Sequence, residues 1–351
     1  MPLIEFTDKG LCCPQGQFYV DPWKPVPKAI ITHAHSDHAR FGNQYYLSHH
    51  HTMPLLQLRL GENNYESIGW NEPVFMNGVK VSLHPAGHMI GSSQVRIEYK
   101  GEVWVVSGDY KTEDDNISSA FEPVRCNTFI TESTFGLPIY NWKPQAEIYQ
   151  NIKDWIIQNC EDEKTSVLIA YSLGKAQRLL QPIAETGKKI FLHGAVWNAH
   201  QALVKSGWDL PQVERVWQDA PKDIYKGQVV IAPSSAESSP WMKRFTPYAV
   251  GICSGWMQVR GNVRRKNADA GFVLSDHADW KGLLDTIRNT GAEKVFVTHG
   301  FQSAFSRYLN ETGIEAAEVK TEYGGEEDND PINQLAEEQI NLSTGPGEQS
   351  V

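Results

Sequence analysis

The sequence predicts an α/β protein, because short apolar runs rich in β-branched residues alternate with helical patterns along most of its 351 residues. Gly, Pro, Asn, Asp or Ser bounds each run, as is usual for strands. The first third is richer in such runs, and the middle has a clearer strand–helix rhythm. A chain of this length corresponds to about two domains, or to one domain with a large insertion.

The expected elements follow one another along the chain. Apolar runs predict strands at residues 29–32, 79–83, 95–99, 103–106, 129–131, 167–170, 190–192, 229–232, 250–253, 272–274 and 295–298. Apolar residues that recur on one face predict three helices: at 144–160 through Ile148, Ile152 and Ile156, at 174–185 through Leu179, Leu180 and Ile183, and at 279–289 through Leu283, Leu284 and Ile287.

Composition excludes several classes of protein. With 40% hydrophobic and 21% charged residues, the chain is not expected to be disordered, collagen-like or a coiled coil. The sequence contains no run of 18 apolar residues, so no membrane span is predicted. The N-terminus lacks the features of a secretion signal. The five scattered cysteines form no CxxC pair, which favours reduced thiols. We therefore expect a cytoplasmic protein without membrane contact.

The net charge of −10 comes entirely from the C-terminal part of the chain. Residues 311–351 hold 11 acidic residues and one lysine, so the rest of the chain is neutral overall. Global charge therefore does not exclude an anionic substrate. The acidic run at 326–330 is typical of a solvated tail; docking of a partner and mimicry of nucleic acid are the alternatives.

A dense group of metal-ligand residues follows the first expected strand, in the segment HAHSDH at 33–38. Alternate residues of an extended chain point the same way, so His33 and His35 can bind one ion. The turn that follows presents Asp37 and His38 to a neighbouring site. Nitrogen and carboxylate ligands of this kind suit Zn²⁺ or Mn²⁺.

Further ligands must come from elsewhere, because one short motif cannot complete two metal sites. His88 follows the expected strand at 79–83, and Asp109 follows the one at 103–106. Each is preceded by a glycine, which lets backbone approach closely. We expect both to join the histidine motif at one edge of the fold.

The order HAHSDH, AGH and SGD resembles the metallo-β-lactamase superfamily, whose fold is an αββα sandwich with a dinuclear metal site at its edge. The resemblance implies two divalent metal ions (Zn²⁺ or Mn²⁺), one held by His33, His35 and His88 and the other by Asp37, His38 and a further histidine, with Asp109 bridging them.

Later motifs resemble the β-CASP nucleases of that superfamily: TESTFG at 131–136, LSDHAD at 274–279 and FVTHG at 296–300. The matching residues are Glu132, His277 and His299. The segment VLIAYSLGKAQRLL at 167–180 resembles the first strand–helix unit of their cap domain. The resemblance implies a metallo-β-lactamase core at 1–137, an inserted β-CASP-like α/β cap at 138–268, a return to the core at 269–312 and an acidic tail at 313–351.

In such a site two cations polarise a phosphodiester and activate water. The resemblance makes His299 the last ligand of the second metal and assigns Asp37 to both binding and catalysis. His277 would protonate the leaving oxygen. Glu132 would orient the His277 ring by accepting a hydrogen bond from the other ring N–H. Asp21 resembles the early aspartate that supports the metal loop; a turn or helix cap is an equal interpretation.

Other residues predict contacts with nucleic acid. Arg260, Arg264 and Arg265 cluster before the late histidines, where a basic loop would engage phosphates. Ser172 and Lys175 open an expected helix, whose N–H groups favour anions. Aromatic side chains near expected loops would stack unpaired bases: Phe135, Tyr171, Trp241 and Trp256.

The substrate remains open between DNA and RNA. The spelling of the motifs and the compact cap resemble bacterial ligase-associated DNA exonucleases. This implies a repair exonuclease acting on single-stranded ends or flaps, with a DNA ligase and a helicase as partners. His299 instead favours an RNA 3′-end processing ribonuclease, because Artemis-type DNA nucleases usually have an aliphatic residue there. A small-molecule metallo-hydrolase and a metal-free binding protein are further alternatives. We expect DNA.

Overall fold

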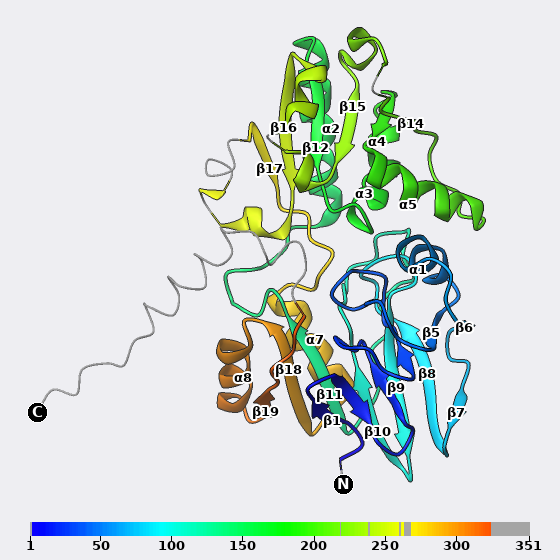
Figure 1. The fold of residues 1–351 in the computed structure, drawn as a ribbon. Helices are drawn as coiled ribbons and strands as arrows, with labels where there is room; N and C mark the ends of the chain where they lie inside the picture. Colours follow the sequence, from blue (N-terminus) through cyan, green and yellow to red (C-terminus); the bar gives the residue numbers. More distant parts are fainter. Residues whose placement is uncertain (1, 218, 238, 260, 263–267, 324–351) are drawn as a thin grey trace, which may run out of the picture.

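The computed structural model describes residues 2–217, 219–237, 239–259, 261–262 and 268–323. Two sheets with flanking helices form the lower part of the molecule in Figure 1, and a third sheet with its own helices forms the upper part. The predicted α/β class is confirmed.

The first sheet comes from the N-terminal 68 residues. Its order is β1-β2-β3-β4-β5-β6, with antiparallel pairing up to β3 and parallel pairing after it. The strands are β1 (Glu5–Thr7), β2 (Gly10–Cys13), β3 (Phe18–Val20), β4 (Ala29–Ile30), β5 (Tyr46–His49) and β6 (Tyr65–Ile68).

The second sheet has the order β19-β18-β11-β10-β9-β8-β7. Strands β7 to β10 form an antiparallel meander, whereas β11, β18 and β19 add in parallel. The strands are β7 (Val74–Met76), β8 (Val79–Pro85), β9 (Ser93–Tyr99), β10 (Glu102–Val106), β11 (Thr128–Ser133), β18 (Lys294–Gly300) and β19 (Glu315–Glu318).

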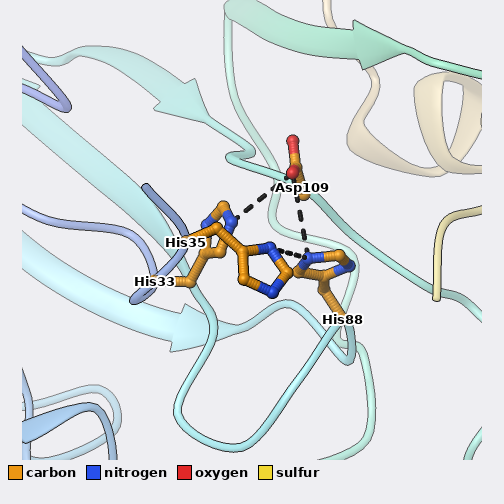
Figure 2. Close-up of side chains that lie close together, drawn as sticks. All are labelled: His33, His35, His88 and Asp109. Atoms are coloured by element: carbon orange, nitrogen blue, oxygen red, sulfur yellow. Dashed lines mark hydrogen bonds and ion pairs between the residues drawn. The ribbon is translucent and has the colours of Figure 1, made fainter. Parts of the chain in front are cut away.

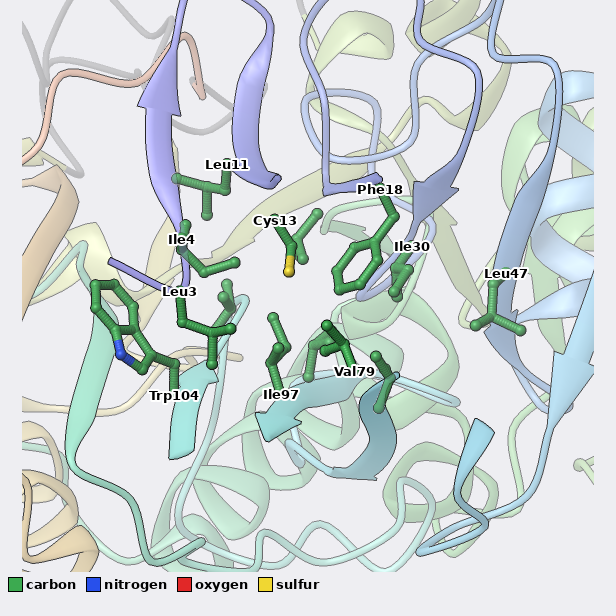
Figure 3. Packing of buried hydrophobic residues seen from close by; sticks show 14 of the residues in the cluster. Leu3, Ile4, Leu11, Cys13, Phe18, Ile30, Leu47, Val79, Ile97 and Trp104 are labelled. Atoms are coloured by element: carbon green, nitrogen blue, oxygen red, sulfur yellow. The ribbon is translucent and has the colours of Figure 1, made fainter. Parts of the chain in front are cut away.

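Both sheets bury one face against each other. Figure 3 shows Leu11, Phe18 and Ile30 of the first sheet packed toward Val79 and Ile97 of the second. Helix α1 (Met53–Leu60) covers the outer side of the first sheet. Helices α7 (Trp280–Thr290) and α8 (Gln302–Glu311) cover the outer side of the second. These layers confirm the expected αββα sandwich.

A third, fully parallel sheet is inserted between β11 and β18, which are neighbours in the second sheet. Its order is β14-β13-β15-β12-β16-β17. The strands are β12 (Thr165–Ile169), β13 (Ile190–Leu192), β14 (Glu214–Arg215), β15 (Val229–Ala232), β16 (Tyr248–Cys253) and β17 (Ala270–Phe272), and the helices are α2 (Gln145–Glu161), α3 (Lys175–Arg178), α4 (Leu180–Ala184) and α5 (Gly194–Lys205).

Two expected boundaries differ from the structure. Strand β17 pairs with β16, so the third sheet extends beyond residue 268. Part of the expected tail belongs to the core, because β19 pairs with β18 while Ile314 and Val319 pack inward. The acidic run at 326–330 lies outside the described residues.

The helix expected at 174–185 is divided into α3 and α4. Pro182 explains the division, because it has no N–H for the carbonyl of Arg178 and its ring collides with that carbonyl in a continuous helix. The helices expected at 144–160 and 279–289 are confirmed as α2 and α7. None of the described helices is both long and apolar enough to cross a membrane.

Candidate metal centre

The first group of metal-ligand atoms lies where the chain leaves the sheets. It comprises His33 and His35 after β4, His88 after β8 and Asp109 after β10, with donor atoms within 4.8 Å of one another. Figure 2 shows the three imidazoles turned toward one another below the carboxylate. Asp109 Oδ2 lies 3.4 Å from His33 Nε2 and 3.8 Å from His88 Nε2. His35 Nδ1 lies 3.1 Å from His88 Nε2.

A second group shares Asp109 with the first and adds His38 and His299. The other carboxylate oxygen, Oδ1, lies 3.5 Å from His38 Nε2 and 3.3 Å from His299 Nε2. Asp37 Oδ2 lies 3.5 Å from His38 Nε2, at the edge of this group. Asp109 therefore presents one oxygen to each group, as a bridging ligand does.

Glycines bring these loops close together. A Cβ on Gly108, at φ +56°, would lie 2.8 Å from the side chain of Thr32, and one on Gly87, at φ +74°, would collide with the carbonyl of Lys111. Because only glycine fits such positions, the loops that carry Asp109 and His88 approach their neighbours closely.

Hydrogen bonds to the outer ring nitrogens fix the histidine orientations. Asp21 accepts from His38 Nδ1 at 2.8 Å, and it also accepts from the backbone N–H and the hydroxyl of Thr32. His88 Nδ1 donates to the carbonyl of Asp276 at 2.8 Å. These contacts leave Nε2 of both histidines facing Asp109. Partners of this type set the tautomer of a metal-binding histidine.

The donor set fits divalent cations. His33, His38, His88 and Asp109 are each less than 5% exposed. His33 Nε2, His38 Nε2 and Asp109 Oδ1 have no hydrogen-bond partner among the described residues. Buried polar atoms normally have partners, and a bound cation would satisfy all three.

The charge states also suit metal binding. Burial lowers the pKa of His33 well below its usual range and that of His35 to about 3, so both imidazoles are neutral ligands at neutral pH. Burial would also lower the pKa of His38, but Asp109, Asp37 and Asp21 raise it to about 10. The high pKa of His38 reflects the negative charge of the three carboxylates around it. A cation bound at this position would take the place of the proton on His38.

Glu132 and His277 form a hydrogen-bonded pair beside the metal-ligand groups. His277 Nδ1 lies 2.9 Å from Glu132 Oε2, and the N–H of Tyr110 donates to Oε1 at 2.8 Å. Burial would raise the pKa of Glu132, yet His277 holds it below its usual value. The His277 ring lies 4.6 Å from that of His88, so the pair borders the first group.

The expected substrate-binding residues fall in different places. Arg260, Arg264 and Arg265 lie outside the described residues. Ser172 is partly exposed in the loop after β12. Lys175 is 1% exposed, with Nζ 3.6 Å from Asp276 Oδ2. This buried position argues against direct contact with a phosphate.

Sequence reasoning missed several neighbours of the centre. Tyr323 stacks on His38, with ring centroids 4.5 Å apart, and donates a hydrogen bond to the carbonyl of Asp21. Tyr171 was expected only as a base-stacking residue, and its edge-on packing against His35, with ring centroids 4.5 Å apart, was not foreseen. Arg178 holds Asp276, whose carbonyl orients His88. No local signal marked Tyr323 or Arg178, because each reaches the centre from a distant element.

Known proteins share similarity with much of this chain. A probable DNA ligase of Opitutus terrae is 30% identical over 321 residues, which is 90% of this chain and 31% of that protein. RNase aCSPSF2 of Saccharolobus solfataricus is 27% identical over 70% of this chain and 57% of its own length. Endoribonuclease YSH1 of Yarrowia lipolytica is 29% identical over 40% of this chain and 16% of its own length. The chain thus spans about a third of the first relative and little more than half of the second.

Similarity also extends to the fold. A crystal structure of a protein of unknown function from Enterococcus faecalis superimposes with a TM-score of 0.57 at 10% identity, over 84% of this chain and 78% of the other. No protein-family model matches the chain. RNase aCSPSF2 and YSH1 are β-CASP nucleases of the metallo-β-lactamase superfamily.

Proposed function

We propose that this chain, which belongs to the β-CASP branch of the metallo-β-lactamase superfamily, is a two-metal-dependent nuclease. The observation that carries the proposal is the pair of buried donor groups that share Asp109. We assign His33, His35 and His88 to one Zn²⁺ or Mn²⁺ ion, and Asp37, His38 and His299 to the other. The third sheet and its helices would be the β-CASP cap.

The residues around the centre have distinct roles in the proposed hydrolysis. Two bound cations would neutralise the phosphodiester and lower the pKa of an attacking water. His277 would pass a proton to the leaving oxygen from Nε2, because Nδ1 is engaged by Glu132. Glu132 would fix the tautomer and stabilise the protonated ring. Asp21 would hold His38 in place through its 2.8 Å hydrogen bond.

DNA is the proposed substrate, cut from single-stranded ends or flaps during repair. Support comes from the relative named a probable DNA ligase, which contains a region similar to 90% of this chain. Two activities joined in one polypeptide commonly serve one process, so a DNA ligase is the proposed partner; a helicase partner rests on the motif resemblance alone. A cytoplasmic location is supported by the five cysteines, none of which forms a disulfide.

RNA 3′-end processing is the second candidate. It is favoured by the relatives named as ribonucleases and by His299, which lies 3.3 Å from Asp109 Oδ1. Those relatives match smaller shares of this chain at lower identity than the probable DNA ligase does.

The test is digestion of 5′-labelled single-stranded DNA and RNA of one sequence, with Mn²⁺ or Zn²⁺ and with Asp37→Ala as the control. Cleavage of DNA alone, with a ladder of end-proximal products, is the expected result. Preference for RNA would transfer the assignment to RNA processing. If the protein cut neither polymer, the nuclease proposal would fall.

A further inference from the structure

Two tryptophans, two arginines and a histidine gather at one side of the third sheet. His193 directly follows β13, Arg215 ends β14 and Trp217 lies two residues further on. Trp241 and Arg244 belong to the 3₁₀ segment η3 (Pro240–Phe245), which connects β15 to β16. We call these five residues the Arg–Trp cluster. None of them is part of the metal-ligand groups.

Contacts join the cluster into one unit. The Arg215 guanidinium lies 4.7 Å from the centre of the Trp217 ring, and that of Arg244 lies 5.6 Å from the centre of the Trp241 ring. Arg244 also donates to the carbonyls of Trp217, at 3.3 Å, and Trp241, at 3.1 Å. The Trp241 ring packs edge-on against His193, with centroids 5.0 Å apart.

The cluster is positively charged and offers an aromatic face to solvent. Trp217 is 59% exposed, so its ring contributes little to the core. Among the described residues, neither Arg215 nor Arg244 forms an ion pair, and the neighbouring Glu214 is paired with Lys189. Burial and both guanidinium groups lower the pKa of His193, which leaves the arginines as the source of charge.

Two residues of the cluster, His193 and Arg215, lie at the edge of the third sheet that faces the metal centre. Strand β12 ends just before Tyr171 and Leu173, and both contact His35. All strands of this sheet are parallel, so His193 and Arg215 lie at the same carboxyl edge. In the order β14-β13-β15-β12, they are two and three strands away from β12, or about 10 and 14 Å at the usual strand spacing.

We propose that the Arg–Trp cluster is a subsite for single-stranded nucleic acid, with a base stacked on Trp217 and a backbone phosphate bound by Arg215. This inference rests on the proposed nuclease function. Exposed aromatic rings beside cations are the usual platform for unpaired strands. At about 3.4 Å per stacked nucleotide, the separation of β13 and β14 from β12 corresponds to roughly three to four nucleotides. An oligonucleotide long enough to reach the subsite therefore binds more tightly than a dinucleotide, which cannot reach it.

The experiment compares cleavage of oligo-dT of 2, 4, 8 and 16 nucleotides with Mn²⁺. For the wild type, kcat/KM should rise steeply between 2 and 8 nucleotides. Trp217→Ala should lose about tenfold on the longer substrates and leave the dinucleotide unchanged, whereas Trp217→Phe should retain most of the rise. Phe75→Ala, which removes another exposed ring from the edge strand β7, is the matched control.

Binding of fluorescent dT16 without added metal provides the second readout. Arg215→Ala should weaken binding and lower the slope of log K against log salt by about 0.7, the value for one phosphate contact with a single strand. Arg288→Ala removes an exposed guanidinium on α7 and should leave the slope unchanged.

The two proposals fail in different ways. Unchanged length dependence and binding in both cluster variants, while the wild type cuts DNA, would overturn the subsite and leave the nuclease intact. If the wild type cut no oligonucleotide, the proposed function would fail, whereas loss of dT16 binding in Trp217→Ala would still support the subsite. Equal losses on the dinucleotide and on dT16 would also overturn it, because they would indicate a general distortion.

Discussion

Replacing Arg178 with Met is expected to lower the free energy of unfolding by about 3–5 kcal/mol, the usual cost of breaking a buried ion pair. Arg178 is 4% exposed. It donates to Asp276 Oδ1 at 2.8 Å, to the carbonyl of Ser275 at 2.5 Å and to the Tyr149 hydroxyl at 2.9 Å. Without it, the buried Asp276 carboxylate loses its nearest cation and keeps Lys175, whose Nζ lies 3.6 Å from Oδ2.

The pKa of Asp276 gives the same interaction a pH dependence. Burial would raise this pKa, but Lys175 and Arg178 hold it at about 2, below the unfolded value of 3.8. A lowered carboxyl pKa stabilises the fold above the unfolded value, and this stability is lost as the pH falls toward 2. The difference corresponds to about 2 kcal/mol. In Arg178→Met the pKa rises, so the loss begins at a higher pH.

Urea unfolding at pH 7 and at intervals down to pH 3 measures both effects. Asp276→Asn and the double variant Arg178→Met/Asp276→Asn complete a double-mutant cycle. The free energy of unfolding of the double variant should be about 2 kcal/mol higher than the sum of the two single losses predicts. Arg288→Met, which breaks an exposed pair with Asp285, is the control and should cost less than about 1 kcal/mol. A loss in Arg178→Met no larger than in this control, or strict additivity, would refute the reasoning.

Three further predictions concern the centre itself. Asp109→Ala should abolish phosphodiester cleavage and reduce bound metal, measured by atomic emission, because both groups lose their shared ligand; full activity would remove the two-metal proposal. His277→Ala should lower kcat by about 10²–10⁴ and remove one limb of the pH–rate profile while metal content stays constant; loss of metal would instead make His277 a ligand. Asp21→Asn weakens the hydrogen bond that orients His38, so metal affinity measured by chelator competition should fall about 10–100-fold; unchanged affinity would contradict the support assigned to Asp21.

Much of the centre could be predicted because its ligands occupy conspicuous local positions. His33, His88 and Asp109 each follow an apolar strand within a few residues, and each belongs to a short motif dense in polar side chains. The end of β4 in the first sheet meets the ends of β8 and β10 in the second where the two sheets pack together. The structure brings these residues together as expected, within 4.8 Å of one another.

Elements without such a signal were missed or wrongly bounded. Strand β19 was expected to be part of an acidic tail, because Glu315 and Glu318 dominate its composition, yet pairing with β18 decides its conformation. The segment 174–185 was expected to be one helix because its apolar residues recur with helical spacing. Pro182 was given too little weight, and the structure divides the helix at Leu179. In the first case the acidic composition concealed the pairing with β18, and in the second the apolar periodicity concealed the effect of one proline.

By itself, the sequence determined the α/β class and the donor types of the centre, because strand periodicity and metal-ligand residues can be read from consecutive positions. The αββα core was expected only from the resemblance of the motifs to a known superfamily. The tertiary structure alone decided which oxygen of Asp109 faces which histidines, that Tyr323 stacks on His38, and that Arg178 supports His88 through Asp276. The physical reason is that these contacts join segments up to 285 residues apart. Their geometry depends on how the three sheets pack, and no local pattern encodes that packing.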